Sequence, residues 1–322
     1  MMKWLGVWGG ALLVGGVLGG CGTANDETPM RGAAQRPANV QPVSDPEFER
    51  VNEEWRQQRL QELKQDDGWG SLVGLYWVKL NGHFIGSSPE SGMRLSVGPP
   101  RMGLITRDSE GRIYFTPEQG MKLTYNGKPL TAQVRFQSDA DPEPGTIGFD
   151  DGKGSLSLIK RGPQYGIRVR HADAAASFEF PQLDYWPADP AWRINARFVP
   201  SLPRTRIPVT NILGIVSQLP SPGAIEFERD GATHRLDAIG EPGGPLSIVF
   251  SDYTNGRESY ASGRFLDVAA PSPDGMVEVD FNRAYNPPCA FTKYTTCLMP
   301  PENNRLEIPV PAGEKFVRNR PQ

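Results

Sequence analysis

Turn dipeptides recur along this chain between short runs of apolar residues. Glycine follows a polar residue at Asn81-Gly82, Glu110-Gly111, Asn126-Gly127, Asp230-Gly231 and Asn255-Gly256. Asn-Gly and Asp-Gly pairs favour the positive φ angles of tight hairpin turns. The runs between them are rich in Val, Ile, Leu, Tyr, Phe and Thr, which suit pleated strands. The pattern therefore predicts a succession of antiparallel strands.

The strands predicted from these runs are short and numerous. They cover residues 71–78, 103–107, 112–116, 132–136, 154–160, 166–170, 193–198, 224–228, 247–250, 258–266 and 276–281. No repeat of fixed period is present, which argues against a propeller or a solenoid. We expect a mainly β fold, an antiparallel sandwich or partly open barrel with one N-terminal amphipathic helix.

That helix is predicted over residues 46–66. Apolar residues recur there at helical spacing, at Phe48, Val51, Trp55, Leu60 and Leu63. Ser44 or Asp45 can cap the start, and Pro46 suits the first helical position. The polar face is acidic as well as basic, so we expect the helix to pack on the domain rather than on a membrane.

Residues 1–20 have the three parts of an export signal. A charged start at Lys3 precedes an apolar stretch, and small residues precede Cys21. The apolar stretch is shorter than the roughly 20 residues that a spanning helix needs. The sequence predicts a signal peptide over 1–20, an acylated and disordered tether over 21–45, and a single β-rich domain over 46–317. The stretch 181–192 is interpreted as a buried connection within that domain.

Leu18-Gly19-Gly20-Cys21 resembles the bacterial lipobox. The resemblance implies cleavage before Cys21 and a lipid on its sulfur, and two or three acyl chains hold a protein stably on a membrane. The alternative is an ordinary cleaved signal with an incidental cysteine. We expect a lipid-anchored protein of the cell envelope, whose partner through the anchor is the membrane. Gly22 favours the outer membrane, facing the periplasm, in an organism with two membranes.

The charge balance argues against nucleic acid as a partner. The chain has 34 Lys and Arg against 37 Asp and Glu, a formal net charge of −3, and removal of Lys3 with the signal makes it more negative. Nucleic-acid binding needs a clustered positive field. The short basic stretches Arg204-Thr205-Arg206 and Arg318-Asn319-Arg320 are interpreted as solvated loop charge.

Local catalytic motifs are absent from the sequence. It has no G-x-S-x-G, H-E-x-x-H, phosphate loop or dinucleotide fingerprint, and its three histidines, His83, His171 and His234, are far apart. The fold can still assemble a triad or a metal site from distant residues. We interpret each histidine as a surface or hydrogen-bonded core residue, and we expect no cofactor and no metal.

Cys289 and Cys297 are the two cysteines that follow Cys21. An even pair within one loop of an exported protein favours a disulfide, which would stabilise the fold by about 2.5 kcal/mol in the chain-entropy model. Free buried thiols, or a metal or redox role, are the alternatives.

Polar and aromatic residues are dense in two stretches near the C-terminus, at residues 250–266 and 279–291. The second contains Asp280-Phe281-Asn282-Arg283-Ala284-Tyr285-Asn286-Pro287-Pro288-Cys289-Ala290-Phe291, and later come Pro300-Pro301, Asn304-Arg305-Leu306 and Ala312-Gly313-Glu314. Together they resemble the bacterial family catalogued as domain of unknown function 1684. Trp55-Arg56 and residues 67–77 match its opening, so the resemblance runs from about residue 47 to 316. Leu298-Met299 departs from the family pattern, which places Pro near Cys297.

The same stretches supply the candidate binding or catalytic residues. These are Asp252, Thr254, Glu258, Tyr260, Arg264, Asp280, Asn282, Tyr285, Asn286 and Arg305. If residues 252–264 form one strand, the side chains at even positions share a face. Two prolines after Asn286 make a stiff turn that can present neighbouring side chains.

Three interpretations of this region remain open. A polar face can bind a small polar ligand or an envelope component through residues 252–305, which is our leading expectation. Alternatively, Asp252, Glu258 and Asp280, with Arg264 as charge partner, serve a hydrolase acting on an envelope or sugar-like substrate. A third interpretation is a buried polar network that fixes loops and sheet. The family supplies no reaction, so whether the protein is an enzyme stays open.

Overall fold

A computed structural model describes residues 45–177 and 183–316 of the chain. Cys21, the predicted signal and almost all of the tether lie outside the described residues. The described helices are α1 (Pro46–Lys64), α2 (Ala172–Ser177) and the short 3-10 helices η1 (Trp69–Ser71), η2 (Asp150–Gly152), η3 (Pro190–Trp192), η4 (Phe281–Arg283), η5 (Pro288–Ala290) and η6 (Glu302–Asn304). No described helix is long and apolar enough to cross a membrane.

Helix α1 begins where the sequence predicts. The Asp45 carboxylate accepts hydrogen bonds from the backbone N–H groups of Glu47 and Phe48 at 3.1 and 3.2 Å, and Pro46 opens the helix. These bonds satisfy two of the N–H groups that a helix start leaves without partners. Phe48 and Leu63 are buried at its two ends. The predicted amphipathic helix is therefore confirmed, two residues shorter at its C-terminal end.

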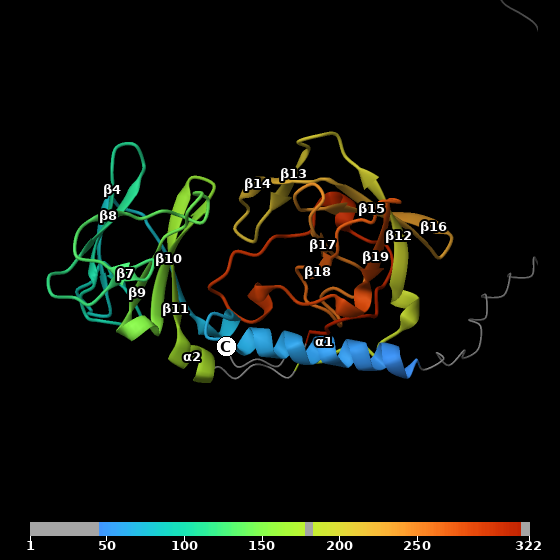
Figure 1. Ribbon diagram of the computed structural model, residues 1–322, viewed down its shortest axis with the longest axis horizontal. Helices are drawn as coiled ribbons and strands as arrows, with labels where there is room; N and C mark the ends of the chain where they lie inside the picture. The colour runs from blue at the N-terminus through green and yellow to red at the C-terminus, as the bar shows by residue number, and fades with distance from the viewer. Residues whose placement is uncertain (1–44, 178–182, 317–322) are drawn as a thin grey trace, which may run out of the picture. The chain divides into compact units, whose positions relative to one another are not determined.

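Two sheets build the N-terminal half (Figure 1). One has the order β1-β11-β10-β9-β6-β7, with β1 (Leu72–Trp77), β6 (Thr124–Tyr125), β7 (Lys128–Pro129), β9 (Thr146–Phe149), β10 (Gly154–Arg161) and β11 (Gln164–His171). The other has the order β3-β2-β4-β5-β8, with β2 (Gly82–Gly86), β3 (Met93–Arg94), β4 (Gly103–Arg107), β5 (Ile113–Pro117) and β8 (Val134–Arg135). Their apolar side chains, such as Ile105, Phe115 and Leu156, form one core cluster.

The C-terminal half has three smaller sheets. They are β16-β15-β12-β19, β13-β14 and β17-β18, with β12 (Arg193–Pro200), β13 (Arg206–Thr210), β14 (Val216–Pro220), β15 (Gly223–Arg229), β16 (Ala232–Ala238), β17 (Leu246–Phe250), β18 (Arg264–Val268) and β19 (Met276–Asp280). A second core cluster joins Ile225, Leu236, Ile248, Leu266 and Phe281. Helix α1 runs along this half (Figure 1), where it contacts η4 and where Leu63 packs with Ala290 and Phe291.

The mainly β prediction is confirmed. Every described strand pairing except the parallel pair β2–β3 is antiparallel, and none of the five described sheets closes into a barrel. Trp186 and Trp192, in the predicted connection, are both buried. Of the predicted turns, Glu110-Gly111, Asn126-Gly127 and Asp230-Gly231 close the hairpins β4–β5, β6–β7 and β15–β16, with positive φ at each of these glycines.

Two of the predicted hairpins are absent from the described residues. Asn81-Gly82 does not close a hairpin, because Gly82 opens β2, which pairs with β4, whereas β1 pairs with β11. Asn255-Gly256 is a turn with Gly256 at φ +77°, but no described strand hairpin flanks it.

The predicted strand over 258–266 is confirmed only at residues 264–266 and is wrong before them, because β18 begins at Arg264. Side chains of the preceding segment bond to their own backbone instead. Asp252 accepts from the N–H of Thr254 at 2.8 Å, and Asn255 accepts from the N–H of Asp252 at 2.6 Å. Such local bonds compete with a strand ladder. The even-numbered side chains from Asp252 to Tyr260 therefore do not share a strand face.

Candidate functional site

Asp252 and Arg264 form an ion pair inside the C-terminal half. Asp252 follows β17, and Arg264 opens β18, which pairs with β17. Nη2 of Arg264 lies 2.8 Å from Oδ2 of Asp252, and both side chains are 0 % exposed. Because a buried charge without its partner is costly, each of the two side chains requires the other.

Arg264 also holds the C-terminal segment. Its guanidinium donates to the backbone carbonyls of Val310, at 2.8 Å, and of Ala312. The guanidinium carbon Cζ lies 5.2 Å from the ring centre of Trp186. Burial lowers the pKa of Arg264, and Asp252 opposes that shift. The other oxygen of Asp252 accepts from the N–H of Val310 at 3.1 Å. The pair thus ties the β17–β18 hairpin to residues 310–312.

A second buried ion pair joins Glu314 to helix α1. Arg59 Nε lies 3.1 Å from Oε1 of Glu314, the N–H of Asn286 donates to Oε2 at 2.7 Å, and the Tyr185 hydroxyl donates to Oε1 at 3.3 Å. Burial raises the pKa of Glu314, and Arg59 opposes that shift. Four segments distant in the sequence therefore meet at one carboxylate.

The sequence interpretation missed Arg59, Glu314 and Tyr185. Arg59 lies four residues before the buried Leu63 and eleven after the buried Phe48, on the face of α1 that packs inward. A charged residue at a core-facing helical position was the available signal. Glu314 belongs to the string Ala312-Gly313-Glu314, which contributed to the family resemblance but suggested no role.

Asp280 and Asn282 bind each other and a neighbouring segment. Asp280 Oδ1 accepts from the backbone N–H and the side-chain Nδ2 of Asn282, at 3.0 and 2.8 Å, which caps η4. Asn282 Nδ2 donates to the carbonyl of Asp189 at 2.9 Å, and its Oδ1 accepts from the N–H of Asp189 at 2.8 Å. Both predicted residues are therefore used to hold η4 against the chain before η3.

Four other predicted residues also bond within the protein. The Thr254 hydroxyl lies 2.8 Å from that of Ser259, Tyr260 donates to the carbonyl of Cys289 at 3.3 Å, Tyr285 donates to Asp267 at 2.7 Å, and Asn286 Nδ2 donates to the carbonyl of Lys315 at 2.9 Å. Glu258 and Arg305 are exposed. Of the ten predicted residues, eight are held by internal bonds, which is the pattern of a structural network.

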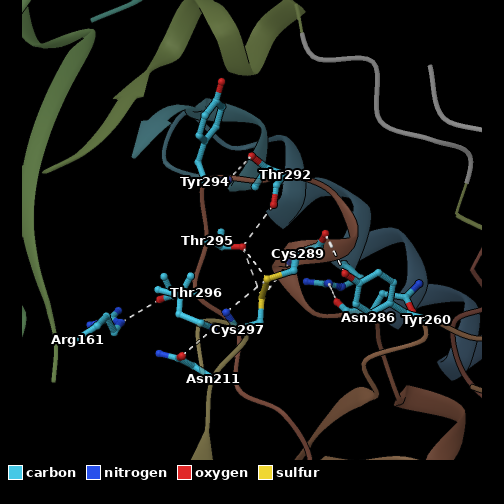
Figure 2. The surroundings of a disulfide bond; sticks show 12 residues. Arg161, Asn211, Tyr260, Asn286, Cys289, Thr292, Tyr294, Thr295, Thr296 and Cys297 are labelled. Carbon is cyan, nitrogen blue, oxygen red and sulfur yellow. Dashed lines mark hydrogen bonds between the residues drawn. A yellow bond between two sulfur atoms is a disulfide. The ribbon is translucent and has the colours of Figure 1, made fainter. Parts of the chain in front are cut away.

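The predicted disulfide between Cys289 and Cys297 is confirmed, with Cα atoms 6.1 Å apart. Figure 2 shows the loop that it closes, with Thr295 beside the two sulfur atoms and Thr296 directed toward Arg161. Thr296 accepts a bond from Arg161 Nε at 2.9 Å, and the carbonyl of Cys297 accepts from the N–H of Ile212 at 3.0 Å. The disulfide therefore fixes a loop that contacts both β10 and the β13–β14 connection.

The histidines lie at separate places in the fold. His83 accepts from the N–H of Leu80 at 3.1 Å, His171 is buried near Asp150, and His234 stacks beside Phe227 with ring centres 5.3 Å apart. Within residues 45–177 and 183–316, no three His, Cys, Asp or Glu side chains gather as metal ligands.

An open groove lies elsewhere in the C-terminal half. We call it the proline-lined groove; it is lined by Phe198, residues 200–206, residues 220–222, residues 240–243, Leu246 and Pro271. Its volume is about 850 Å³, and six of its residues are prolines. None of the ten predicted site residues lines it. The sequence analysis missed the groove because its prolines are scattered over four loops and strand ends.

The groove has an apolar floor and a charged rim. Leu246 is buried in its wall, whereas Leu202 is 82 % exposed. Arg204, Arg206 and Glu241 are exposed at its edge. Arg206 donates to the carbonyl of Gln218 at 2.7 Å, whereas the Arg204 side chain makes no hydrogen bond or ion pair with the described residues. This rim carries two cations and one carboxylate, so it is net positive.

Comparison with known proteins gives one family match. Residues 178–315 match the family described as "Protein of unknown function (DUF1684)". The match leaves out the upstream residues 47–177, to which the sequence resemblance was expected to extend. Among solved structures, an uncharacterized protein of Haloarcula marismortui, determined by NMR, is 30 % identical over 42 % of this chain and 77 % of its own, with a TM-score of 0.36. No curated protein matches the chain significantly.

Proposed function

Because the chain belongs to the family of unknown function 1684, whose description assigns no activity, we propose a function from its structure. The protein is a lipid-anchored binding protein of the cell envelope that takes a small amphiphile into the proline-lined groove. The groove, open and mainly apolar under a positive rim, is the observation that carries this proposal.

The anchor part of the proposal rests on the N-terminal sequence. Residues 1–20 serve as the signal peptide, and Cys21 bears the lipid. Gly22 favours the outer membrane, facing the periplasm, where the organism has two membranes. The residues from 22 to 44 then link the membrane to helix α1.

The size and stiffness of the groove suit a small ligand. A volume of about 850 Å³ lies within the roughly 300–1,000 Å³ typical of small-molecule sites. Proline fixes its own φ angle, so walls rich in proline lose little conformational entropy when a ligand binds. The side chains of Phe198 and Leu202 offer an apolar surface for a hydrocarbon chain.

The rim indicates the charge of the ligand. Within the described residues Arg204 has no hydrogen-bond or ion-pair partner, and an arginine pairs well with a carboxylate or a phosphate. Glu241 disfavours a second negative group on its own part of the rim. An amphiphile with one anionic head and an apolar tail matches this arrangement.

The 252–305 region supports a structural role better than a binding site. Asp252 is paired with Arg264, and Asp280 caps η4, so neither carboxylate is free for acid–base work. Glu258 is exposed. The hydrolase alternative therefore gains no support from the geometry. A ligand for this region remains a prediction, since the proline-lined groove includes none of these residues.

Binding of dodecanoate tests the groove, with dodecanol as the uncharged comparison. For the full chain carrying Cys21→Ser, titration calorimetry should give dodecanoate a several-fold lower Kd than dodecanol. Arg204→Gln should reduce that preference by about 2- to 5-fold, because exposed ion pairs contribute up to about 1 kcal/mol. Leu202→Asp should weaken both ligands.

Leu80→Asp is the matched control, because Leu80 is 65 % exposed and lies outside the groove. It should leave both Kd values unchanged. Absence of dodecanoate binding, or an equal loss in Leu80→Asp and Leu202→Asp, would overturn the proposed groove ligand.

A further inference from the structure

The outer face of the β10–β11 hairpin carries a row of cationic and hydroxyl side chains. Ser155 lies opposite Arg170, and Ser157 lies opposite Arg168. Directly opposed residues of an antiparallel pair project from the same face. The intervening Leu156, Ile167 and Val169 point into the core cluster. The four polar residues therefore stand together on the face away from that core.

Arg168 is the member of this row that lacks a counter-charge. Its Nε is buried without a hydrogen-bond partner, and no hydrogen bond or ion pair to its guanidinium exists among residues 45–177 and 183–316. Burial lowers its pKa to about 10, and the neighbouring Arg161 and Arg170 contribute to that shift. A half-buried guanidinium between two other cations is costly unless an anion is present.

The neighbouring arginines are already occupied. Arg161 binds Asp139 at 2.7 Å and Thr296 at 2.9 Å. Arg170 donates to the carbonyl of Gly68 at 2.8 Å and to the Ser71 hydroxyl at 3.0 Å. They contribute positive potential. Asp139 opposes the lowering of the Arg168 pKa, but its carboxylate is bonded to Arg161, so Arg168 forms no ion pair within the described residues.

We infer that Arg168, with the hydroxyls of Ser155 and Ser157, forms a binding site for a phosphate-type oxyanion. A guanidinium presents paired N–H donors that match two oxygens of a phosphate, and serine hydroxyls donate to the remaining oxygens. A polar pocket of about 340 Å³ beside the row is lined by Ser155, Lys153 and Arg170 together with Asp66, Asp67 and Asp151, and it includes neither Arg168 nor Ser157. The inferred anion site therefore lies at the Arg168 part of the row and not in this pocket. This site is separate from the proline-lined groove and does not depend on the proposed function.

The phosphate group can belong to inorganic phosphate or to an anionic phospholipid headgroup. Two arms of one experiment separate these sources, both with the full chain. In the first, the Tm of the protein is measured in 20 mM phosphate and compared with its Tm in chloride at equal ionic strength. In the second, co-sedimentation is measured with vesicles of phosphatidylglycerol against vesicles of phosphatidylcholine.

The variant Arg168→Gln should remove the phosphate-dependent rise in Tm and weaken phosphate binding at least about tenfold, as expected when a charge-assisted bond is lost. It should also melt at or above the wild-type Tm in chloride, because an unpaired charge is gone. Arg112→Gln is the control, since Arg112 is a surface arginine paired with Asp108. It should keep the full response to phosphate.

A phosphate response without preferential sedimentation with phosphatidylglycerol assigns the site to the free ion. Sedimentation with phosphatidylglycerol that Arg168→Gln reduces assigns it to a headgroup. Equal responses of wild type and Arg168→Gln in both arms would overturn the inference. So would a Tm of Arg168→Gln in chloride well below that of the wild type, because Arg168 would then have an internal role.

Discussion

At the residue scale, the C-terminal half is built around two buried ion pairs, Asp252–Arg264 and Arg59–Glu314. Arg264 lies within a set of acceptors, namely the Asp252 carboxylate and the carbonyls of Val310 and Ala312. Such a set specifies one arrangement of loops, because any other arrangement leaves a charge buried and unpaired.

Loss of one partner should therefore be severe. Asp252→Ala leaves Arg264 buried without its carboxylate, and we expect it to lower the free energy of unfolding by about 3–5 kcal/mol. Urea denaturation measures this change. Arg197→Ala removes a pair whose arginine is 68 % exposed, and it should cost under about 1 kcal/mol. Similar losses in the two variants would contradict the framework role.

Tyr185 predicts how stability changes at alkaline pH. Burial raises its pKa above 10.0, and the nearby Glu314 adds to the shift. Above pH 10 the unfolded chain releases this proton while the folded protein retains it, so the free energy of unfolding falls as pH rises. The slope is up to about 1.4 kcal/mol per pH unit for one such group.

Tyr185→Phe should flatten that slope between pH 10 and pH 11, measured by urea denaturation at each pH. The substitution also removes the bond to Glu314, but this lowers stability across the whole range and leaves the slope as the readout. Tyr253→Phe, at a tyrosine that is 59 % exposed, is the control. An unchanged slope in Tyr185→Phe would contradict the prediction.

At the scale of elements, the sequence predicts helices and hairpins best where interactions between residues near in sequence determine them. Helix α1 has an apolar stripe, a capping Asp45 and Pro46 at its start, and its first residue follows from them. Asn126-Gly127 and Asp230-Gly231 both adopt positive φ and close hairpins, because their strands pair with their neighbours in sequence.

Prediction fails for elements that are determined by contacts between residues distant in sequence. Strands such as β13, β14 and β16 are short or polar, and their pairing rather than their composition makes them strands. The candidate site shows the same limit. The sequence identified Asp252 and Arg264 but could not show that they pair with each other, and it missed Glu314 because the partner Arg59 is 255 residues away.

The loop 289–297 is an element held by its disulfide. If both cysteines are oxidised, thiol titration of the acylated protein in denaturant without reductant should find no free thiol. Cys289→Ser with Cys297→Ser should lower the free energy of unfolding by about 2.5 kcal/mol in the chain-entropy model. Two free thiols per chain in the wild type would contradict the bond.

At the scale of the whole molecule, the described contacts connect the start of the fold to its end. Arg59 of α1 binds Glu314, and Arg56 donates to the carbonyl of Trp186 at 2.9 Å. Helix α1 is also the first described element after the predicted tether. Helix α1, the described element that follows the proposed anchor in sequence, is thus held in place by Glu314 of the C-terminal segment.

The anchor itself gives the last prediction. If Cys21 bears the lipid, cells supplied with labelled fatty acid should incorporate label into the wild-type chain and not into Cys21→Ser, since no other cysteine follows the signal segment closely. Cys21→Ser should also leave the membrane fraction, because the lost acyl chains contribute about 0.8 kcal/mol per buried CH₂. Its Tm should match the wild type, since Cys21 lies 25 residues before Pro46, the first residue of α1. Equal labelling of both chains would refute the lipid anchor, whereas loss of label with retained membrane association would place a second membrane contact on the folded part.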